Sequence, residues 1–165
     1  MNRGNVLKNT RITRVGSNGV YLDDQMSGWL VTDNYIEGAK GARTGLELGG
    51  GRRNKVLRNK LSGFGLGVRL LSLGGGAAVS AEMRARVAEL LRPGSPWAAQ
   101  YPELLNISDH AGFPVHTDIS DNVYDSDIWM QTTEGPANGF NMTTPKENAA
   151  NLKAWLSTAT NNTRV

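Results

Sequence analysis

Hydrophobic and polar residues alternate along several short segments of this chain, as they do in β-strands. Three segments share one frame, in which a glycine precedes two apolar residues separated by a variable one; they read GVYL, GLEL and GVRL. Successive side chains of a strand point to opposite faces. The variable residues Tyr21, Glu47 and Arg69 are therefore expected to face outward. The inward positions are Val20, Leu22, Leu46, Leu48, Val68 and Leu70.

A second pattern repeats with a period of about 25 residues, which is typical of solenoid proteins. The segments NVLKNTRI, WLVTDNYI and NKVLRNKL each carry an asparagine three residues after a valine. A fourth copy, TDISDNVY, places Ile119 and Asn122 in the same relation. The asparagines of the first three copies are Asn9, Asn34 and Asn59, and the valines are Val6, Val31 and Val56.

Two short strands per repeat, joined by glycine-rich corners, predict one coil of a parallel β-solenoid. Such coils stack at the ordinary strand spacing of about 4.8 Å. One asparagine per coil suits an internal ladder, in which each side-chain amide bonds the next. A doubly wound α/β sheet is disfavoured because no helical segment interrupts the coils. A leucine-rich repeat is disfavoured because the repeated asparagine stands near a valine and not within a pattern of regularly spaced leucines. The predicted fold class is all-β.

These strings resemble right-handed parallel β-helix proteins of the pectate-lyase-like superfamily. The resemblance covers residues 2–73 well and 114–125 moderately. In the glycine corner the arginine is doubled or falls one residue early, so that motif matches loosely. The motifs that carry the resemblance are Leu22-Asp23-Asp24, Ser27-Gly28, Val31-x-x-Asn34 and Gly50-Gly51-Arg52-Arg53-Asn54.

The resemblance implies a secreted, periplasmic or cell-surface protein that degrades polysaccharide, as a glycoside hydrolase or a polysaccharide lyase. The fold does not select the activity, because β-helices carry many functions. Two alternatives stay open. One is a non-catalytic β-helix module for glycan binding or surface adhesion, and the other is an inactive truncated remnant. The expected partner of an active protein is a polysaccharide or oligosaccharide.

The composition changes after residue 73, where three glycines interrupt the repeat. The run AEMRARVAELLR has helical spacing and predicts an α-helix around 77–92, capped by Ser80. We expect this helix to pack on the flank of the coils or to cover a groove. The expected parts of the chain are coils over 1–73, an insertion with one helix and an irregular loop over 74–113, a resumed coil over 114–133, and a polar segment over 134–165.

In the polar segment, 148–156 is expected to form a short helix, and the last nine residues are expected to fray. Three or four coils are near the minimum for a solenoid, and both ends need caps. No amphipathic cap precedes Asn5. We therefore expect either further coils upstream, in a longer parent protein, or capping by homo-oligomerisation.

Charge and composition exclude several classes of partner and of chemistry. The net charge of +3 is small and dispersed, so nucleic-acid binding is not predicted. No apolar run reaches the roughly 18 residues of a membrane span, and the first residues do not resemble a signal peptide. The chain has no cysteine, which excludes disulfides and thiolate chemistry.

Outward positions of one sheet form a row with one residue per coil, so Tyr21, Glu47 and Arg69 are expected side by side. Asp23 lies on the same face, two residues beyond Tyr21. The Cβ atoms of Asp23 and Glu47 would then be about 8 Å apart. That lies within the roughly 6.5–9.5 Å expected for the carboxyl pair of an inverting glycosidase. One carboxyl would protonate the leaving oxygen while the other activates water.

Lysis of an acidic sugar is the competing mechanism. A basic group removes a proton beside the sugar carboxylate, and a cation stabilises the resulting charge. Arg69, Lys55 or Arg53 would serve in these roles. Ca²⁺ would be the cofactor, held by the carboxylate oxygens of Asp23 and Asp24.

Ordinary structural roles compete with each of these assignments. Asp24 points away from the face of Asp23 if the strand continues, and it more simply begins a turn. Glu47 and Arg69 would form a surface salt bridge. The predicted catalytic residues are Asp23, Glu47 and Arg69; the predicted substrate-binding residues are Tyr21, Arg52, Arg53 and Lys55; the predicted metal ligands are Asp23 and Asp24.

Overall fold

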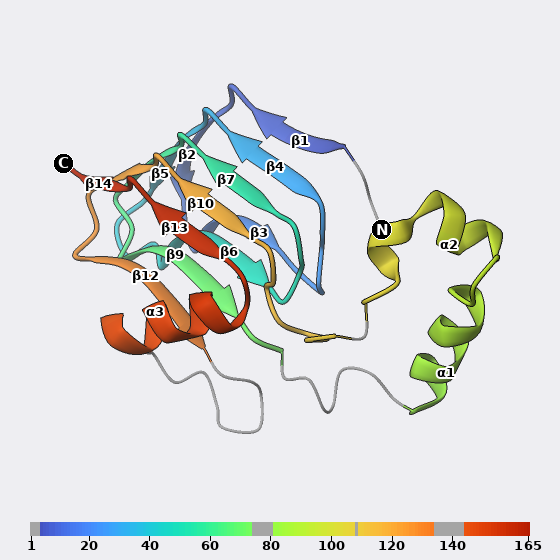
Figure 1. The fold of residues 1–165 in the computed structure, drawn as a ribbon. Helices are drawn as coiled ribbons and strands as arrows, with labels where there is room; N and C mark the ends of the chain where they lie inside the picture. Colours follow the sequence, from blue (N-terminus) through green and yellow to red (C-terminus); the bar gives the residue numbers. More distant parts are fainter. Residues whose placement is uncertain (1–3, 74–80, 108, 134–143) are drawn as a thin grey trace.

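The chain folds as a right-handed parallel β-helix, seen in a computed structural model that describes residues 4–73, 81–107, 109–133 and 144–165 (Figure 1). Successive coils stack so that every strand pairs in parallel with the equivalent strand of the next coil. The all-β fold class expected from the repeat is confirmed.

Three parallel sheets run along the described coils. Sheet A contains β1 (Asn5–Lys8), β4 (Trp29–Thr32), β7 (Lys55–Leu57), β10 (Asp118–Ser120) and β13 (Thr158–Thr160). Sheet B contains β2 (Arg11–Val15), β5 (Tyr35–Gly38), β8 (Lys60–Ser62), β11 (Val123–Tyr124) and β14 (Thr163–Arg164). Sheet C contains β3 (Asn18–Leu22), β6 (Thr44–Gly49), β9 (Leu66–Leu71) and β12 (Ile128–Thr133).

A one-residue bend gives each coil a third strand, where the sequence pattern predicts only two. The segment around each repeated asparagine is split between sheets A and B by a residue with positive φ. The φ angle is 57° at Asp33 and 58° at Asp121, and Asn9, Arg58 and Asn161 adopt the same conformation at equivalent positions. Asparagine and aspartate enter this left-handed region more readily than most residues. Short polar side chains therefore favour the turn between these two sheets.

Buried asparagines directly after these bends join the coils in a ladder. Asn59 Oδ1 accepts hydrogen bonds from the backbone N–H of Asn34 at 3.1 Å and from its side-chain amide at 2.9 Å. Asn59 Nδ2 donates to the carbonyl of Val31 and to Asn122 Oδ1, both at 3.0 Å. The backbone N–H and the side-chain amide of Asn122 both donate to Asn162 Oδ1 at 3.0 Å. The predicted ladder is confirmed for Asn34, Asn59 and Asn122.

The first coil departs from the predicted register by one residue. Leu7 pairs with Val31, where the predicted repeat places Val6. The first repeat is therefore one residue shorter than predicted. The predicted ladder position of Asn9 is therefore wrong. Thr10 lies opposite Asn34, and its backbone N–H donates to Asn34 Oδ1 at 3.0 Å. Asn9 makes the bend instead. Both residues suit a polar bend, so the sequence alone does not distinguish these registers.

The last nine residues do not fray but form strands of a fifth coil. Ala159 of β13 pairs with Ile119 of β10, and β14 pairs with β11. Asn162 adds a fourth asparagine to the ladder. The segment TATNNTR carries few apolar residues, which hides its relation to the earlier copies.

One continuous core fills the space between the three sheets. The glycine that opens the first sheet C frame is required by its packing. A Cβ atom on Gly19 would lie 2.5 Å from the carbonyl oxygen of Gly45 and 2.6 Å from Ile36 Cγ2. The most deeply buried core residues include Val31, Ile36, Leu46, Leu48, Val56, Leu61, Val68, Leu70 and Ile119.

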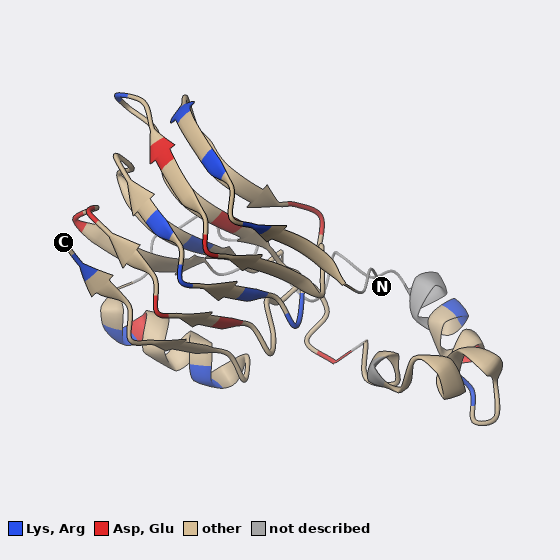
Figure 2. Ribbon diagram, turned by 90° about the horizontal axis from the view of Figure 1, so that it is seen from above, with Lys and Arg blue, Asp and Glu red and all other residues tan. Residues whose placement is uncertain are grey.

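Both helical insertions leave the coils at the corner between sheet C and sheet A. The first contains α1 (Ala81–Leu90), α2 (Pro96–Gln100) and η1 (Pro102–Leu104). The helix expected around 77–92 is confirmed as α1, although its predicted cap Ser80 lies outside the described residues. Figures 1 and 2 place α1 and α2 apart from the sheets, not on their flank. No helix within the described ranges is long and apolar enough to span a membrane.

The second insertion contains α3 (Pro145–Ala154), which lies across the last strand of sheet C (Figure 1). It begins three residues earlier than the predicted helix, at a capping box formed by Thr144 and Glu147. The side chain of Asn148 makes the hydrogen bonds that the backbone of a further strand would make at the edge of β12. It donates to the carbonyl of Met130 and accepts from the N–H of Thr132, both at 2.8 Å. The edge of β12 is thereby capped.

The ladder predicts a contrast between two asparagines. Asn59→Ala leaves buried amide groups of both neighbouring coils without partners, so it should lower the free energy of unfolding by about 2–4 kcal/mol. Asn9→Gly keeps the left-handed bend and removes only an exposed side chain, so the change should stay within about 0.5 kcal/mol. Denaturant unfolding measures both. Equal losses for the two variants would contradict the assigned register.

Candidate functional site

The outer face of sheet C carries a row of four polar side chains, one from each strand. Tyr21 pairs in register with Glu47, Glu47 with Arg69, and Arg69 with Gln131. The first three are the residues that the sequence places side by side, and the structure confirms that they are adjacent. Gln131 is missed by the sequence pattern, although IWMQTT can be aligned with LGVRLL. We refer to Tyr21, Glu47, Arg69 and Gln131 as the polar row.

An ion pair forms the centre of the polar row. Arg69 Nη2 donates to Glu47 Oε2 at 2.6 Å, and Asn18 Nδ2 donates to the same oxygen at 2.9 Å. Arg69 also donates to Thr44 Oγ1 at 3.3 Å. The Arg69 side chain is 18% exposed and that of Glu47 only 6%. The expected salt bridge therefore exists, but it is sheltered from solvent, which weakens the screening that applies to surface pairs.

Tyr21 and Asp23 form the exposed end of the row. Tyr21 is 42% exposed. Partial burial raises the pKa of its hydroxyl to about 12, helped by a hydrogen bond to Asp23 and by the negative charges of Asp23, Glu47 and Asp24. The neighbour of Asp23 on the next coil is Gly49, which has no side chain to cover the carboxylate. Asp23 is therefore open to a ligand.

The two adjacent aspartates lie in the corner after β3, which ends at Leu22, and Asp24 begins a turn as predicted. Asp24 and Gln25 both have positive φ, and the N–H of Gln25 donates to the carbonyl of Gly49 at 2.7 Å. Asp24 thus lies in the turn. The carboxylate that accepts a backbone N–H there is that of Asp23, from Asp24 at 2.8 Å. Across the described residues no cluster of three or more His, Asp or Glu side chains could hold a metal ion.

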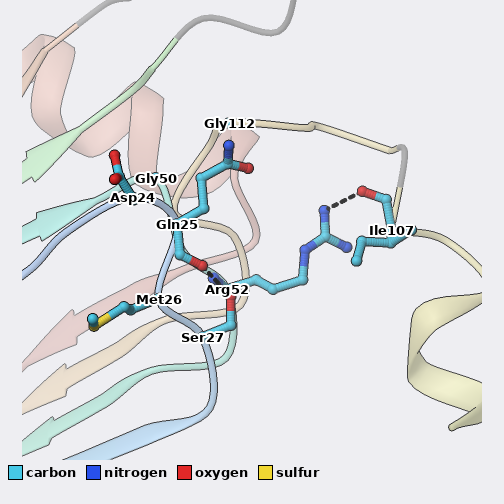
Figure 3. Close-up of a pocket in the computed structure, with 8 residues that line it drawn as sticks. All are labelled: Asp24, Gln25, Met26, Ser27, Gly50, Arg52, Ile107 and Gly112. Atoms are coloured by element: carbon cyan, nitrogen blue, oxygen red, sulfur yellow. Dashed lines mark hydrogen bonds between the residues drawn. The ribbon is translucent and has the colours of Figure 1, made fainter. Parts of the chain in front are cut away.

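The basic residues predicted to bind substrate lie away from the polar row. Arg52 is 9% exposed, in the corner after β6. Its guanidinium donates to the carbonyls of Asn106, Ile107 and Asp109 at 2.7–3.1 Å, and Figure 3 shows it reaching across a cavity of about 360 Å³ to Ile107. Burial, reinforced by the charge of Arg53, lowers the pKa of Arg52. Arg52 therefore anchors the insertion to the coils.

Arg53 and Lys55 are exposed, in the same corner and at the start of β7 in sheet A. The structure does not bring them to the outer face of sheet C. Figure 2 shows Lys and Arg interspersed with Asp and Glu over the strands, not gathered on one face. The dispersed charge expected from the sequence is therefore visible in the fold.

Unpartnered polar atoms gather on sheet C. Buried polar atoms almost always find a hydrogen-bond partner. Four atoms on these strands are buried and have none within the described structure, against two in the rest of its described residues. Water or a polar ligand would supply the missing bonds. The four atoms are Asn18 Oδ1, Arg69 Nε, Gln131 Oε1 and Thr133 Oγ1.

Comparison of the chain with protein-family models, with curated proteins and with solved structures finds no match. The fold itself shows a parallel β-helix with a buried asparagine ladder, and no more of the superfamily resemblance than that. Function must be inferred from the geometry of the polar row.

The sheltered ion pair should show strong energetic coupling. A double-mutant cycle on Glu47→Gln and Arg69→Met should give a coupling free energy of about 1–3 kcal/mol, because each single change leaves a largely buried group without its partner. The matched control is Glu37→Gln with Arg11→Met, an exposed pair 3.8 Å apart. Its coupling should stay below about 1 kcal/mol. Equal coupling in both cycles would show that Glu47 and Arg69 act as an ordinary surface pair.

The raised pKa of Tyr21 can be tested by titration. Wild-type protein should show one tyrosine whose phenolate absorbance appears only near its pKa of about 12, and Tyr21→Phe should remove that step. Asp23→Asn should move the step toward the ordinary value of about 10, because a negative neighbour and hydrogen-bond acceptor is lost. A step that is unchanged in Asp23→Asn would contradict the contact between Tyr21 and Asp23.

Proposed function

We propose that this β-helix belongs to a polysaccharide-degrading lineage of the pectate-lyase-like superfamily and that the polar row holds the glycan chain. The observation that carries the proposal is the gathering of unpartnered buried polar atoms on sheet C, beside an exposed tyrosine. Sugar hydroxyls both donate and accept hydrogen bonds, so they suit a mixture of free acceptors and a free guanidinium N–H. A ligand that only accepts hydrogen bonds would leave the two amide oxygens unsatisfied.

The spacing of the row also suits a polymer. Its four residues come from successive coils at about 4.8 Å per coil, so the row extends over about 14 Å. That length matches a few sugar units lying along the axis of the β-helix. Tyr21 presents an aromatic ring at the exposed end, where stacking on the apolar face of a sugar ring would add to affinity.

Hydrolysis is the chemistry that the two carboxylates support best. Arg69 and Asn18 hold the carboxylate of Glu47 in place, where it would act as the general base that activates water. Asp23 is exposed and makes no ion pair among the described residues, so it is the carboxyl that is accessible to the leaving oxygen, and we assign it the role of general acid. Asp23 and Glu47 stay assigned to the pair of an inverting glycosidase, with Arg69 fixing Glu47 in place.

Lysis needs a base and a cation that are free to act. Arg69 is held by Glu47 and Thr44, and this makes it a poorer base than the sequence alone suggests. A Ca²⁺ ion on Asp23 and Asp24 would supply the cation, although it needs about 6–8 oxygen ligands. With a polymeric glycan as its ligand, the protein would be secreted, periplasmic or on the cell surface, as the family resemblance implies.

A glycan-binding module without catalysis is the second candidate. The observation that favours it is the mutual neutralisation of Glu47 and Arg69, the two central charges of the row. Binding requires only the tyrosine and the hydrogen-bonding groups, whereas turnover requires Asp23 and Glu47 to exchange protons with substrate.

The test is a screen against neutral and uronate polysaccharides. Binding would be measured by affinity electrophoresis, and turnover by release of reducing ends and by absorbance of unsaturated products. Tyr21→Ala should weaken glycan binding about tenfold, equivalent to about 1.4 kcal/mol. Tyr35→Ala, on the outer face of sheet B, is the matched control and should leave binding unchanged.

Turnover by the wild type, together with its loss in Asp23→Asn, separates the two candidates. A hydrolase should lose turnover and keep glycan affinity, while a binding module shows no turnover in the wild type. If the wild type neither binds nor cleaves any glycan, the proposed function is wrong. If Tyr35→Ala and Tyr21→Ala weaken binding equally, the glycan does not lie on sheet C.

A further inference from the structure

A second cavity of about 510 Å³ opens between α3 and the last coil. This volume lies in the range of small-molecule sites. Residues of α3 and of β12 line most of it, and Ala159 of β13 also contributes to the lining. None of the residues predicted from the sequence to carry function lines this cavity. The β12 wall is made by Ile128, Trp129, Met130 and Gln131, and the α3 wall by Pro145, Asn148, Ala149 and Leu152.

The walls combine an aromatic ring with two amides. Trp129 stacks on Tyr124 with ring centroids 4.5 Å apart, which fixes the indole in place. Met130 and Leu152 add apolar surface. The carboxylate of Asp127 lies at the rim, where it pairs with Arg164. An apolar surface with a few fixed polar groups is the usual composition of a site for a small ring-shaped ligand.

The two amides that line the cavity differ in their hydrogen bonding. Asn148 is fully used, because it caps the edge of β12 through Met130 and Thr132. Gln131 is only 6% exposed, and its Oε1 has no hydrogen-bond partner within the described structure. An unpaired buried amide oxygen costs about 1–3 kcal/mol unless another group bonds it. Gln131 therefore carries a buried acceptor that no described group bonds.

Register connects this cavity to the polar row. Gln131 is the last member of the row, in direct register with Arg69. A glycan chain that starts at Tyr21 and follows the row toward the C-terminal coil would therefore reach the cavity at its far end. Gln131 is the residue that the row and the cavity share.

We propose that this cavity is an end subsite that binds one neutral pyranose unit of the glycan; the inference rests on the proposed function. A neutral sugar fits because it brings hydroxyl donors for Gln131 and for the carboxylate of Asp127. A uronate unit fits less well, because the charged side chain among the described lining residues is the carboxylate of Asp127, and the nearby Arg164 already pairs with it. The apolar face of the pyranose packs against the aromatic and aliphatic wall.

Two neighbouring alanines of α3 provide a matched test. Ala149 lines the cavity and Ala150 does not, and both are exposed. Ala149→Phe should fill the cavity and lower the affinity for D-glucose or D-galactose at least tenfold, as measured by saturation-transfer NMR. Ala150→Phe should leave that affinity unchanged. D-Galacturonate should bind neither the wild type nor the variants.

Gln131→Leu distinguishes a binding site from a packing gap. Removing an unsatisfied buried amide should leave the melting temperature unchanged or raise it, while a subsite should lose hexose binding. If both Gln131→Leu and Ala149→Phe bind hexoses as the wild type does, or if the wild type binds none, the end subsite is wrong.

Oligosaccharides of increasing length separate this failure from a failure of the proposed function. Tyr21→Ala should weaken every length, whereas Ala149→Phe should remove only the gain made by the longest chains. If Tyr21→Ala alone has an effect, the polar row stands and the end subsite does not. If hexoses bind and Ala149→Phe abolishes that binding, but no oligosaccharide responds to Tyr21→Ala, the cavity is a site and the polar row is not its continuation.

Discussion

The buried asparagine ladder is the constraint on which the rest of this fold depends. A side-chain amide inside an apolar core must satisfy its donors and its acceptor, because an unpaired buried amide is costly. Asn59 meets this condition only when Asn34 of the preceding coil and Asn122 of the following coil stack directly on either side of it. Each coil therefore has one permitted register. A slip of one residue would break the ladder and would turn every side chain of the strands to the opposite face.

Because the ladder fixes register in sheets A and B, variation in coil length is confined to the remaining corners. Successive core positions in sheet A are Leu7, Val31, Val56, Ile119 and Ala159, so two short steps along the chain are followed by two much longer ones. The two long steps place their helices between the end of a sheet C strand and the next sheet A strand. Both insertions thus emerge beside sheet C, the face that also carries the polar row.

The sequence predicts those features of the site that local chemistry determines, and it misses those that depend on distant segments. The glycine-apolar frames align Tyr21, Glu47 and Arg69, because tight packing in each coil requires the glycine that opens its frame. Arg52 resembles a solvent-exposed binding residue in sequence, yet three carbonyls of a distant insertion enclose it. Gln131 follows that same insertion, whose length conceals its register with Arg69. The sequence therefore locates one end of the polar row and misses the other.

The chemistry of the polar row follows from how its charges are arranged. Glu47 and Arg69 are stable away from water because they face each other, and Asn18 completes the bonding of the carboxylate. A pair that is already satisfied gains little by releasing its charges to a substrate, so Arg69 is suited to hold Glu47 in place and not to react itself. The groups with unmet bonding capacity lie around the pair, at Asn18 Oδ1, Arg69 Nε and Gln131 Oε1. Any ligand of sheet C is therefore recognised by hydrogen bonds around a fixed, neutral centre. Proton transfer, where it occurs, depends on Glu47 and on Asp23, which lies beside the row and is open to solvent.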